Sequence, residues 1–117
     1  MYPLISKWTI LPGGESEALS ALMALAKKVE VSEPDTWMYT VHTPDFTAPN
    51  LPTPPAGEVV FFEIYKNKQA FNAHVNGPVF TEFVQNYGFL FLQSNGKPYV
   101  TLEIMQRHAG FIREELK

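Results

Sequence analysis

The clearest pattern of apolar positions lies between Glu58 and Tyr65, which we expect to form a strand. Its two faces would carry Val60, Phe62 and Ile64 on one side and Val59, Phe61 and Tyr65 on the other. A strand that is apolar on both faces needs cover on both sides. In a chain of 117 residues the helices can cover only one face of a four-stranded sheet, and a second copy of the same sheet is the simplest cover for the other.

Apolar residues three and four positions apart predict helices over 15–31, 68–75 and 78–87. Asn67 suits a helix N-cap, and Pro78 suits the first turn of a helix. Further strands are predicted over 2–11, 36–43 and 98–108, and a polar, weakly helical tail over 109–117. The order β-α-β-β-α-α-β predicts an α+β fold of the ferredoxin-like split βαβ type, with a four-stranded antiparallel sheet.

This domain would span residues 1–108 and contain a proline-rich loop over 44–57, which we interpret as a semi-rigid excursion over the surface. The net charge of −3 and the pI of about 5.5 leave no basic stripe, so we expect no nucleic-acid partner. No apolar run approaches the length of a membrane span or a signal peptide, so we expect a cytoplasmic protein with no membrane partner. The absence of cysteine removes disulfides, thiolate catalysis and iron–sulfur clusters.

An ordered set of short runs resembles the antibiotic-biosynthesis monooxygenase (ABM) family. The runs are Pro12-Gly13 before a long helix, Glu33-Pro34-Asp35-Thr36, Tyr39, Glu63-Ile64-Tyr65, Ala70-Phe71 with His74, and Pro78-Val79-Phe80. The set spans residues 2–108, although the loop over 44–57 is longer than the hairpin usual in the family. The resemblance implies a homodimer whose two sheets pack into a shared α+β barrel.

The resemblance also implies a range of activities. Characterised members of the family include cofactor-free oxygenases of quinols and anthrone-type phenols, haem-degrading enzymes and isomerases of small signalling molecules. The haem-degrading branch uses an Asn, a Trp and a His at places that here hold Ser6, His74 and Val84. All three residues depart from that pattern, so we expect no haem ligation by this set and no cofactor of any kind.

A cofactor-free oxygenase needs a base, an apolar pocket and donors for the developing oxyanion. His74 is the best candidate base, because it shares the inner face of its helix with Ala70 and Phe71 and the unperturbed pKa of a histidine side chain lies near neutral pH. Glu63 lies mid-strand among apolar residues, where a carboxylate must be paired or functional. Glu63 could orient His74 or bond the backbone of a partner chain. For His74 the alternative is a buried structural histidine.

Several aromatic side chains could bind a small aromatic substrate, although each could equally be part of the core. They are Tyr39 and Tyr65, whose hydroxyls could donate hydrogen bonds, and the possible wall residues Trp8, Trp37, Phe80 and Phe83. No histidine or carboxylate pair, including those with His42 and His108, has the spacing of metal ligands, so no metal site is predicted.

The sequence therefore predicts a cofactor-independent monooxygenase that oxidises a small aromatic or quinol-type substrate with molecular oxygen. Two alternatives remain open from the residues alone. One is a non-catalytic dimeric module that binds a small ligand or serves a stress response, and the other is an isomerase on the same fold.

Overall fold

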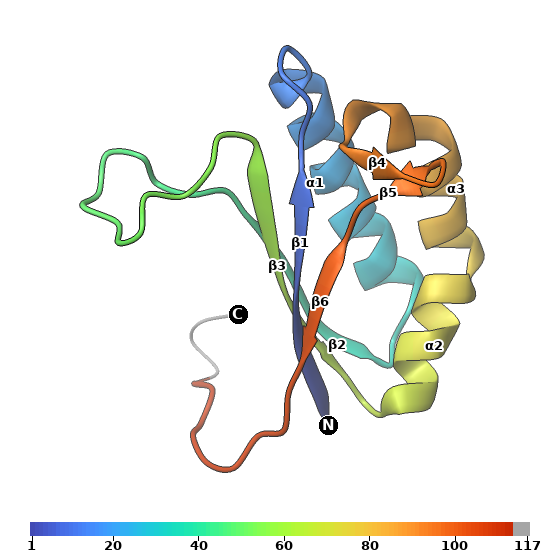
Figure 1. Ribbon diagram of the computed structural model, residues 1–117. Helices are drawn as coiled ribbons and strands as arrows, with labels where there is room; N and C mark the ends of the chain where they lie inside the picture. The colour runs from blue at the N-terminus through green and yellow to red at the C-terminus, as the bar shows by residue number, and fades with distance from the viewer. Residues whose placement is uncertain (114–117) are drawn as a thin grey trace.

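The computed structural model describes residues 1–113, in which three α-helices cover one face of a four-stranded antiparallel sheet (Figure 1). The elements are β1 (Tyr2–Thr9), α1 (Glu15–Ser32), β2 (Thr36–His42), β3 (Glu58–Tyr65), α2 (Lys68–Asn76), α3 (Pro78–Tyr87), the 3₁₀ turn η1 (Gly88–Leu90), β4 (Gln93–Ser94), β5 (Lys97–Pro98) and β6 (Thr101–Ile104). The strand order β2-β3-β1-β6 is that of a ferredoxin-like fold. The predicted fold class is confirmed.

The register of the central strands gathers polar groups on the inner, helix-covered face of the sheet. β1 places Ser6 opposite Phe61 of β3, and Leu4 opposite Glu63. Ser6 and Glu63 are therefore diagonal neighbours on this face, and both are buried among apolar side chains. A buried carboxylate requires hydrogen-bond partners, so the register predicts a polar cluster beneath the helices.

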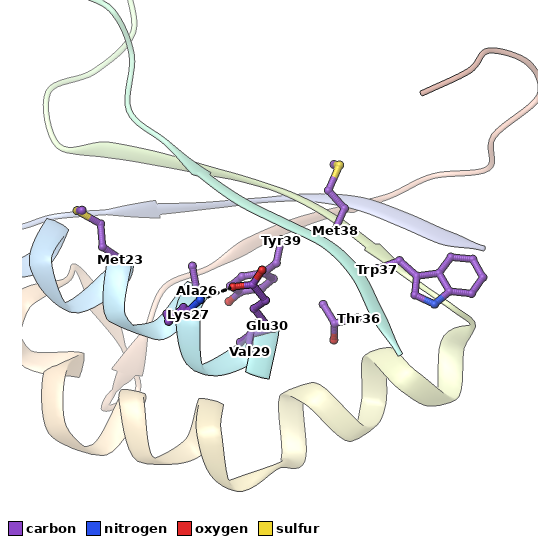
Figure 2. Close-up of a pocket in the computed structure, with 9 residues that line it drawn as sticks. All are labelled: Met23, Ala26, Lys27, Val29, Glu30, Thr36, Trp37, Met38 and Tyr39. Carbon is purple, nitrogen blue, oxygen red and sulfur yellow. Dashed lines mark hydrogen bonds and ion pairs between the residues drawn. The ribbon is translucent and has the colours of Figure 1, made fainter. Parts of the chain in front are cut away.

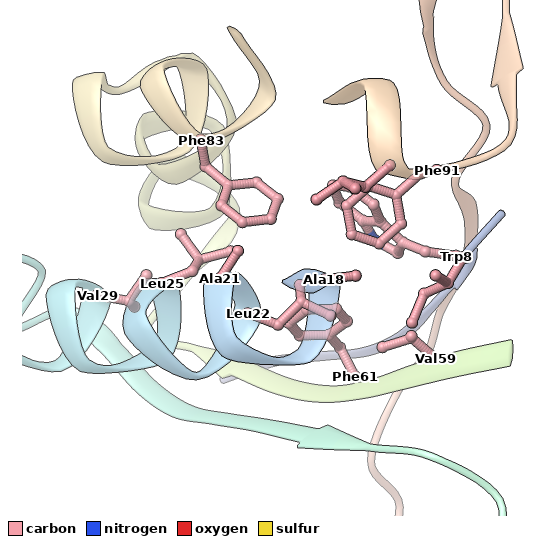
Figure 3. Packing of buried hydrophobic residues seen from close by; sticks show 12 residues of the cluster. Trp8, Ala18, Ala21, Leu22, Leu25, Val29, Val59, Phe61, Phe83 and Phe91 are labelled. Atoms are coloured by element: carbon pink, nitrogen blue, oxygen red, sulfur yellow. The ribbon is translucent and has the colours of Figure 1, made fainter. Parts of the chain in front are cut away.

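Aromatic side chains around Trp8 fill the core between α1, α3 and the sheet (Figure 3). The Trp8 ring meets Phe91 at a centroid distance of 4.9 Å and Phe83 at 6.0 Å, both edge to face. To the same core, α1 contributes small and branched residues at helical spacing: Ala18, Ala21, Leu22, Leu25 and Val29. This packing fixes the indole of Trp8 from one side and leaves another side for the cavity described below.

The segment after β3 forms two short helices, α2 and α3, one directly after the other. The Asn67 side chain accepts a hydrogen bond from the backbone N–H of Ala70 at 2.9 Å and caps α2. Gly77 separates α2 from α3, and a Cβ there would lie 2.6 Å from the carbonyl oxygen of Ala73. Pro78 then opens α3. The predicted cap and helix start are confirmed, and together they aim His74 at the sheet.

Three predicted elements differ from the structure. The last strand covers only 101–104, because Asn95 and Gly96 take positive φ values of 56° and 77° and form the turn of the separate β4–β5 hairpin. The first strand ends at Thr9, and Ile10 makes only an isolated bridge to Phe91. No helix forms over 109–113, and the rest of the predicted tail, 114–117, lies outside the described residues.

The second face of the sheet carries no helix. The proline-rich loop and the segment after β6 lie on that side, away from the helices (Figure 1). Val60 and Ile64 are half-buried there, and Phe62 is 41% exposed. The part of this face that β3 contributes is thus apolar and has no helix over it, as the pattern over 58–65 predicts, whereas β1 and β6 add the ion pair between Lys7 and Glu103. Across residues 1–113, no helix combines the length and apolar character needed to cross a membrane.

Candidate functional site

A cavity of about 160 Å³ lies between the inner face of the sheet and the helices α2 and α3. Five of the predicted site residues line it: His74, Glu63, Tyr39, Trp8 and Phe80. The remaining wall is mostly apolar and consists of Ser6, Phe71, Val75, Val100 and Leu102. An apolar hollow with a few convergent polar groups is the usual form of a small-molecule site.

His74 is held by the carboxylate of Glu33, which follows the end of α1. The Nδ1 atom of His74 lies 2.7 Å from Oε1 of Glu33, and the imidazole is 3% exposed. An ionised carboxylate only accepts, so Nδ1 carries a proton, and in the neutral imidazole Nε2 keeps its lone pair. Nε2 has no partner within residues 1–113, and no unpartnered side-chain nitrogen or oxygen there is fully buried. Nε2 is therefore open to a ligand.

Glu63 is bound by two hydroxyl groups instead of by His74. Ser6 Oγ donates to Oε2 of Glu63 at 2.7 Å, and the Tyr65 hydroxyl donates to Oε1 at 2.5 Å. The buried charge is thereby solvated from inside the protein. Of the two carboxylates beside the cavity, Glu33 orients His74 and Glu63 supplies negative potential nearby.

Both tyrosines of the site remain neutral donors. Burial, followed by the charges of Glu63 and Glu33, raises the pKa of Tyr39 well above its ordinary value. Burial and then the charge of Glu63 likewise raise the pKa of Tyr65. The rings of Tyr39 and Tyr65 lie 5.2 Å and 5.5 Å from the imidazole of His74, measured between centroids. Neither hydroxyl can act as a base near neutral pH.

The structure separates the predicted substrate-binding residues. Tyr65 supports Glu63 and Phe83 packs behind Trp8, and neither lines the cavity. Trp37 does not line the cavity either: the pairing of β2 with β3 is irregular between Thr36 and Met38, and Trp37 is 55% exposed. Phe80 does line the cavity, with its ring centroid 5.1 Å from that of His74.

Sequence reasoning did not find Ser6 or Glu33 as site residues. On the inward face of β1, Ser6 is the polar residue between the apolar Leu4 and Trp8, and that signal was available in the sequence. Glu33 stands 41 positions before His74, in a turn with charged neighbours, and only the packing of α2 against β2 brings the two together.

A larger hollow of about 410 Å³ lies between α1 and the edge strand β2 (Figure 2). Lys27 and Glu30 form an ion pair of 3.0 Å within it, and Met23 and Trp37 stand at its rim. Its lining includes no histidine, and its one acid is paired with Lys27, so the candidate functional groups lie in the smaller cavity. Within residues 1–113 no group of three or more histidine, aspartate or glutamate side chains could hold a metal ion.

Solved structures share this fold. One antibiotic biosynthesis monooxygenase is 21% identical, covers 93% of this chain and 100% of its own, and has a TM-score of 0.72. A candidate antibiotic biosynthesis monooxygenase from Caulobacter crescentus is 16% identical, with coverage of 92% and 90% and a TM-score of 0.75. A third structure, a candidate of the same kind from Deinococcus radiodurans, is 14% identical, with coverage of 97% and 100% and a TM-score of 0.70.

Two further comparisons rest on the sequence. A search of curated proteins finds no significant match. The family model described as antibiotic biosynthesis monooxygenase matches residues 1–86, a stretch that contains β1, β2, β3, His74 and both carboxylates beside it. On this match over most of the chain, and with the fold in agreement, the protein belongs to the antibiotic biosynthesis monooxygenase (ABM) family.

Proposed function

We propose that the protein is a cofactor-independent monooxygenase that oxidises a small phenol or hydroquinone with molecular oxygen. One observation carries the proposal. His74 is fixed at Nδ1 by Glu33, presents Nε2 as a base, and lies at the wall of a cavity lined by the aromatic rings of Trp8 and Phe80.

The reaction begins with proton transfer from the phenol to Nε2 of His74. Glu33 stabilises the imidazolium that forms, since the pair gains a full opposite charge at 2.7 Å. The phenolate is electron-rich enough to pass one electron to oxygen, and the two radicals combine at the open ring position. One oxygen atom stays on that carbon as a carbonyl and the other leaves as water. A phenol with a free para position, such as 1-naphthol, thus consumes one O₂ and gives one quinone and one H₂O. A hydroquinone reacts at its free ortho carbon and gives one hydroxyquinone and one H₂O.

The apolar wall assists in two ways. It excludes water from the radical pair, and it strengthens hydrogen bonds to the substrate oxygen by lowering the local dielectric constant. The neutral hydroxyl of Tyr39, which lines the same cavity, is a donor suited to the phenolate oxygen.

The test is oxygen consumption with 1-naphthol and hydroquinone, followed together with quinone absorbance. We expect one O₂ per quinone, and a rate that falls 10²- to 10⁴-fold in His74→Gln, since a general base contributes about that much. His42→Gln is the matched control, because His42 bonds the Val60 carbonyl far from the cavity and should keep the wild-type rate.

Equal rates in wild type and His74→Gln for every substrate would overturn the proposal. Saturable binding without oxygen consumption would instead favour a ligand-binding module, and an isomeric product without oxygen consumption would favour an isomerase.

We also propose that the protein acts as a homodimer through the open face of the sheet. The half-buried Val60 and Ile64 and the exposed Phe62 form an apolar strip in the middle of this face. The same face of a second copy would cover that strip and bury the apolar surface of both subunits. This is the isologous contact that most homodimers use.

A further inference from the structure

The cavity beside His74, which we call the catalytic cavity, adjoins a second hollow of about 350 Å³. The two share four wall residues: Trp8, Val75, Phe80 and Val100. Beyond this shared wall, the second hollow extends between α3 and the β4–β5 hairpin, where it is lined by Asn76, Thr81, Val84, Lys97 and Pro98. We call it the outer hollow. A ligand too long for the catalytic cavity would extend into it.

The catalytic cavity is too small for a large substrate. Apolar cavities of roughly 150 Å³ hold one benzene molecule, so a volume of about 160 Å³ accommodates one reacting ring. The outer hollow, which shares four wall residues with this cavity, is the adjacent space for a group attached to that ring.

The lining of the outer hollow includes one positive charge, on the exposed Lys97. Among its lining residues Lys97 is the single charged side chain, and it forms no salt bridge within residues 1–113. The neighbouring polar groups are already engaged: Thr81 Oγ1 donates to the Gly77 carbonyl at 2.9 Å, and the Asn76 side-chain amide donates to the Asn72 carbonyl at 2.9 Å. Lys97 is thus the group best placed to receive an anionic substituent.

The hairpin gives this charge a defined position. Lys97 follows directly after the Asn95–Gly96 turn, whose two positive φ values close the hairpin tightly. The hairpin is tied to the body of the domain by two bonds, from Gln93 Nε2 to the Gly88 carbonyl at 2.9 Å and from the Leu92 N–H to the Thr9 carbonyl at 2.8 Å. The backbone that carries Lys97 is therefore part of the wall.

We infer that the substrate is an elongated phenol with an acidic substituent, whose ring occupies the catalytic cavity and whose carboxylate pairs with Lys97 in the lining of the outer hollow. This inference rests on the proposed function for the identity of the ring. It makes Lys97 a specificity-determining residue and not a catalytic one.

The experiment uses phenols whose para position is blocked, so that binding is measured apart from turnover. The probes are 4-hydroxybenzoate, 4-hydroxyphenylacetate and 3-(4-hydroxyphenyl)propionate, each compared with its neutral amide. Binding is followed by Trp8 fluorescence in a Trp37→Phe background, which leaves Trp8 as the only one of the two tryptophans. Lys97→Gln and Lys97→Arg are the test variants, and Lys28→Gln, on the exposed side of α1, is the control of equal charge.

For at least one spacer length we expect the acid to bind about two- to fivefold more tightly than its amide, the range for a partly exposed ion pair. The preference should vanish in Lys97→Gln, survive in Lys97→Arg and Lys28→Gln, and shrink in high salt. Equal affinity of acid and amide at every spacer, or the same loss in Lys28→Gln, would overturn the inference. Preferential binding of the acids in a protein that consumes no oxygen with 1-naphthol would leave the inference standing and defeat only the proposed oxygenase activity.

Discussion

Within residues 1–113, the imidazole of His74 is hydrogen-bonded at Nδ1 alone, and that hydrogen bond decides which nitrogen can accept a proton. Glu33 Oε1 receives two hydrogen bonds, from His74 Nδ1 at 2.7 Å and from the Thr36 hydroxyl at 3.2 Å. The second bond fixes the carboxylate, which in turn fixes the ring. Partners of this kind commonly set the tautomer and orientation of a functional histidine.

Glu33→Gln should lower kcat for 1-naphthol at least tenfold, because an amide can turn its NH₂ toward Nδ1 and move the proton to Nε2. The ¹⁵N chemical shifts of the His74 ring would report the tautomer directly. Thr36→Val is the control: it removes the weaker bond to the same carboxylate and should cost much less. A Glu33→Gln enzyme with the wild-type rate and tautomer would show that Glu33 is not a positioning residue.

At this scale the sequence predicted His74, Glu63, Tyr39 and Trp8 as neighbours of one cavity, because helical and strand periodicity state which way each side chain faces. Periodicity cannot state which acid a histidine will meet. The choice of Glu33 over Glu63 depends on how closely the turn after α1 approaches α2, which is a matter of tertiary packing.

Among the elements, the junction of β1 and β3 has the tightest backbone packing. The Ile10 N–H donates to the Gly57 carbonyl at 2.7 Å, and Gly57 has a φ of +80°. A Cβ at Gly57 would lie 2.5 Å from the Ile10 carbonyl oxygen. Glycine is therefore required there both by conformation and by space.

Gly57→Ala should lower the free energy of unfolding by about 3 kcal/mol, of which about 1 kcal/mol is the cost of the left-handed conformation and the rest is the clash. Gly13→Ala is a matched control, since Gly13 has a φ of +90° but no atom within 4 Å of its Cβ position. Urea unfolding of the two variants measures the difference. Equal losses would mean that the backbone around Ile10 moves freely.

Most elements could be predicted because they are long and strongly patterned: β3 and α3 have the predicted bounds, and α1 and α2 extend one residue further. The β4–β5 hairpin could not be predicted by alternation, since each strand has two residues. Its Asn95–Gly96 pair is a typical hairpin turn, and that local signal competes with the apolar alternation over 98–108.

At the scale of the whole molecule, the proposed homodimer would form through the apolar strip on the open face of the sheet. Phe62→Glu should convert the dimer into a monomer, because a stable dimer would bury about 800 Å² on each subunit and an unpaired carboxylate at its centre is costly. Light scattering at micromolar concentration gives the mass.

Met23→Glu is the control for this change, because Met23 is 71% exposed on the helical side of the domain and should leave the mass unchanged. A wild-type protein that is monomeric at these concentrations would contradict the proposed assembly. The strand pattern predicts that this face needs a cover, but one chain cannot reveal what supplies it.

His74, Glu33 and Glu63 all lie before residue 75, whereas Lys97 comes from the hairpin that follows residue 86, where the match to the family model stops. Under the two proposals, the group that takes the proton and the group that selects an acidic substituent are thus encoded in different stretches of the chain. Exchanging the hairpin would then change the preferred compound while His74, Glu33 and Glu63 stay in place. A match to the family model over residues 1–86 therefore says little about which compound a member of the family accepts.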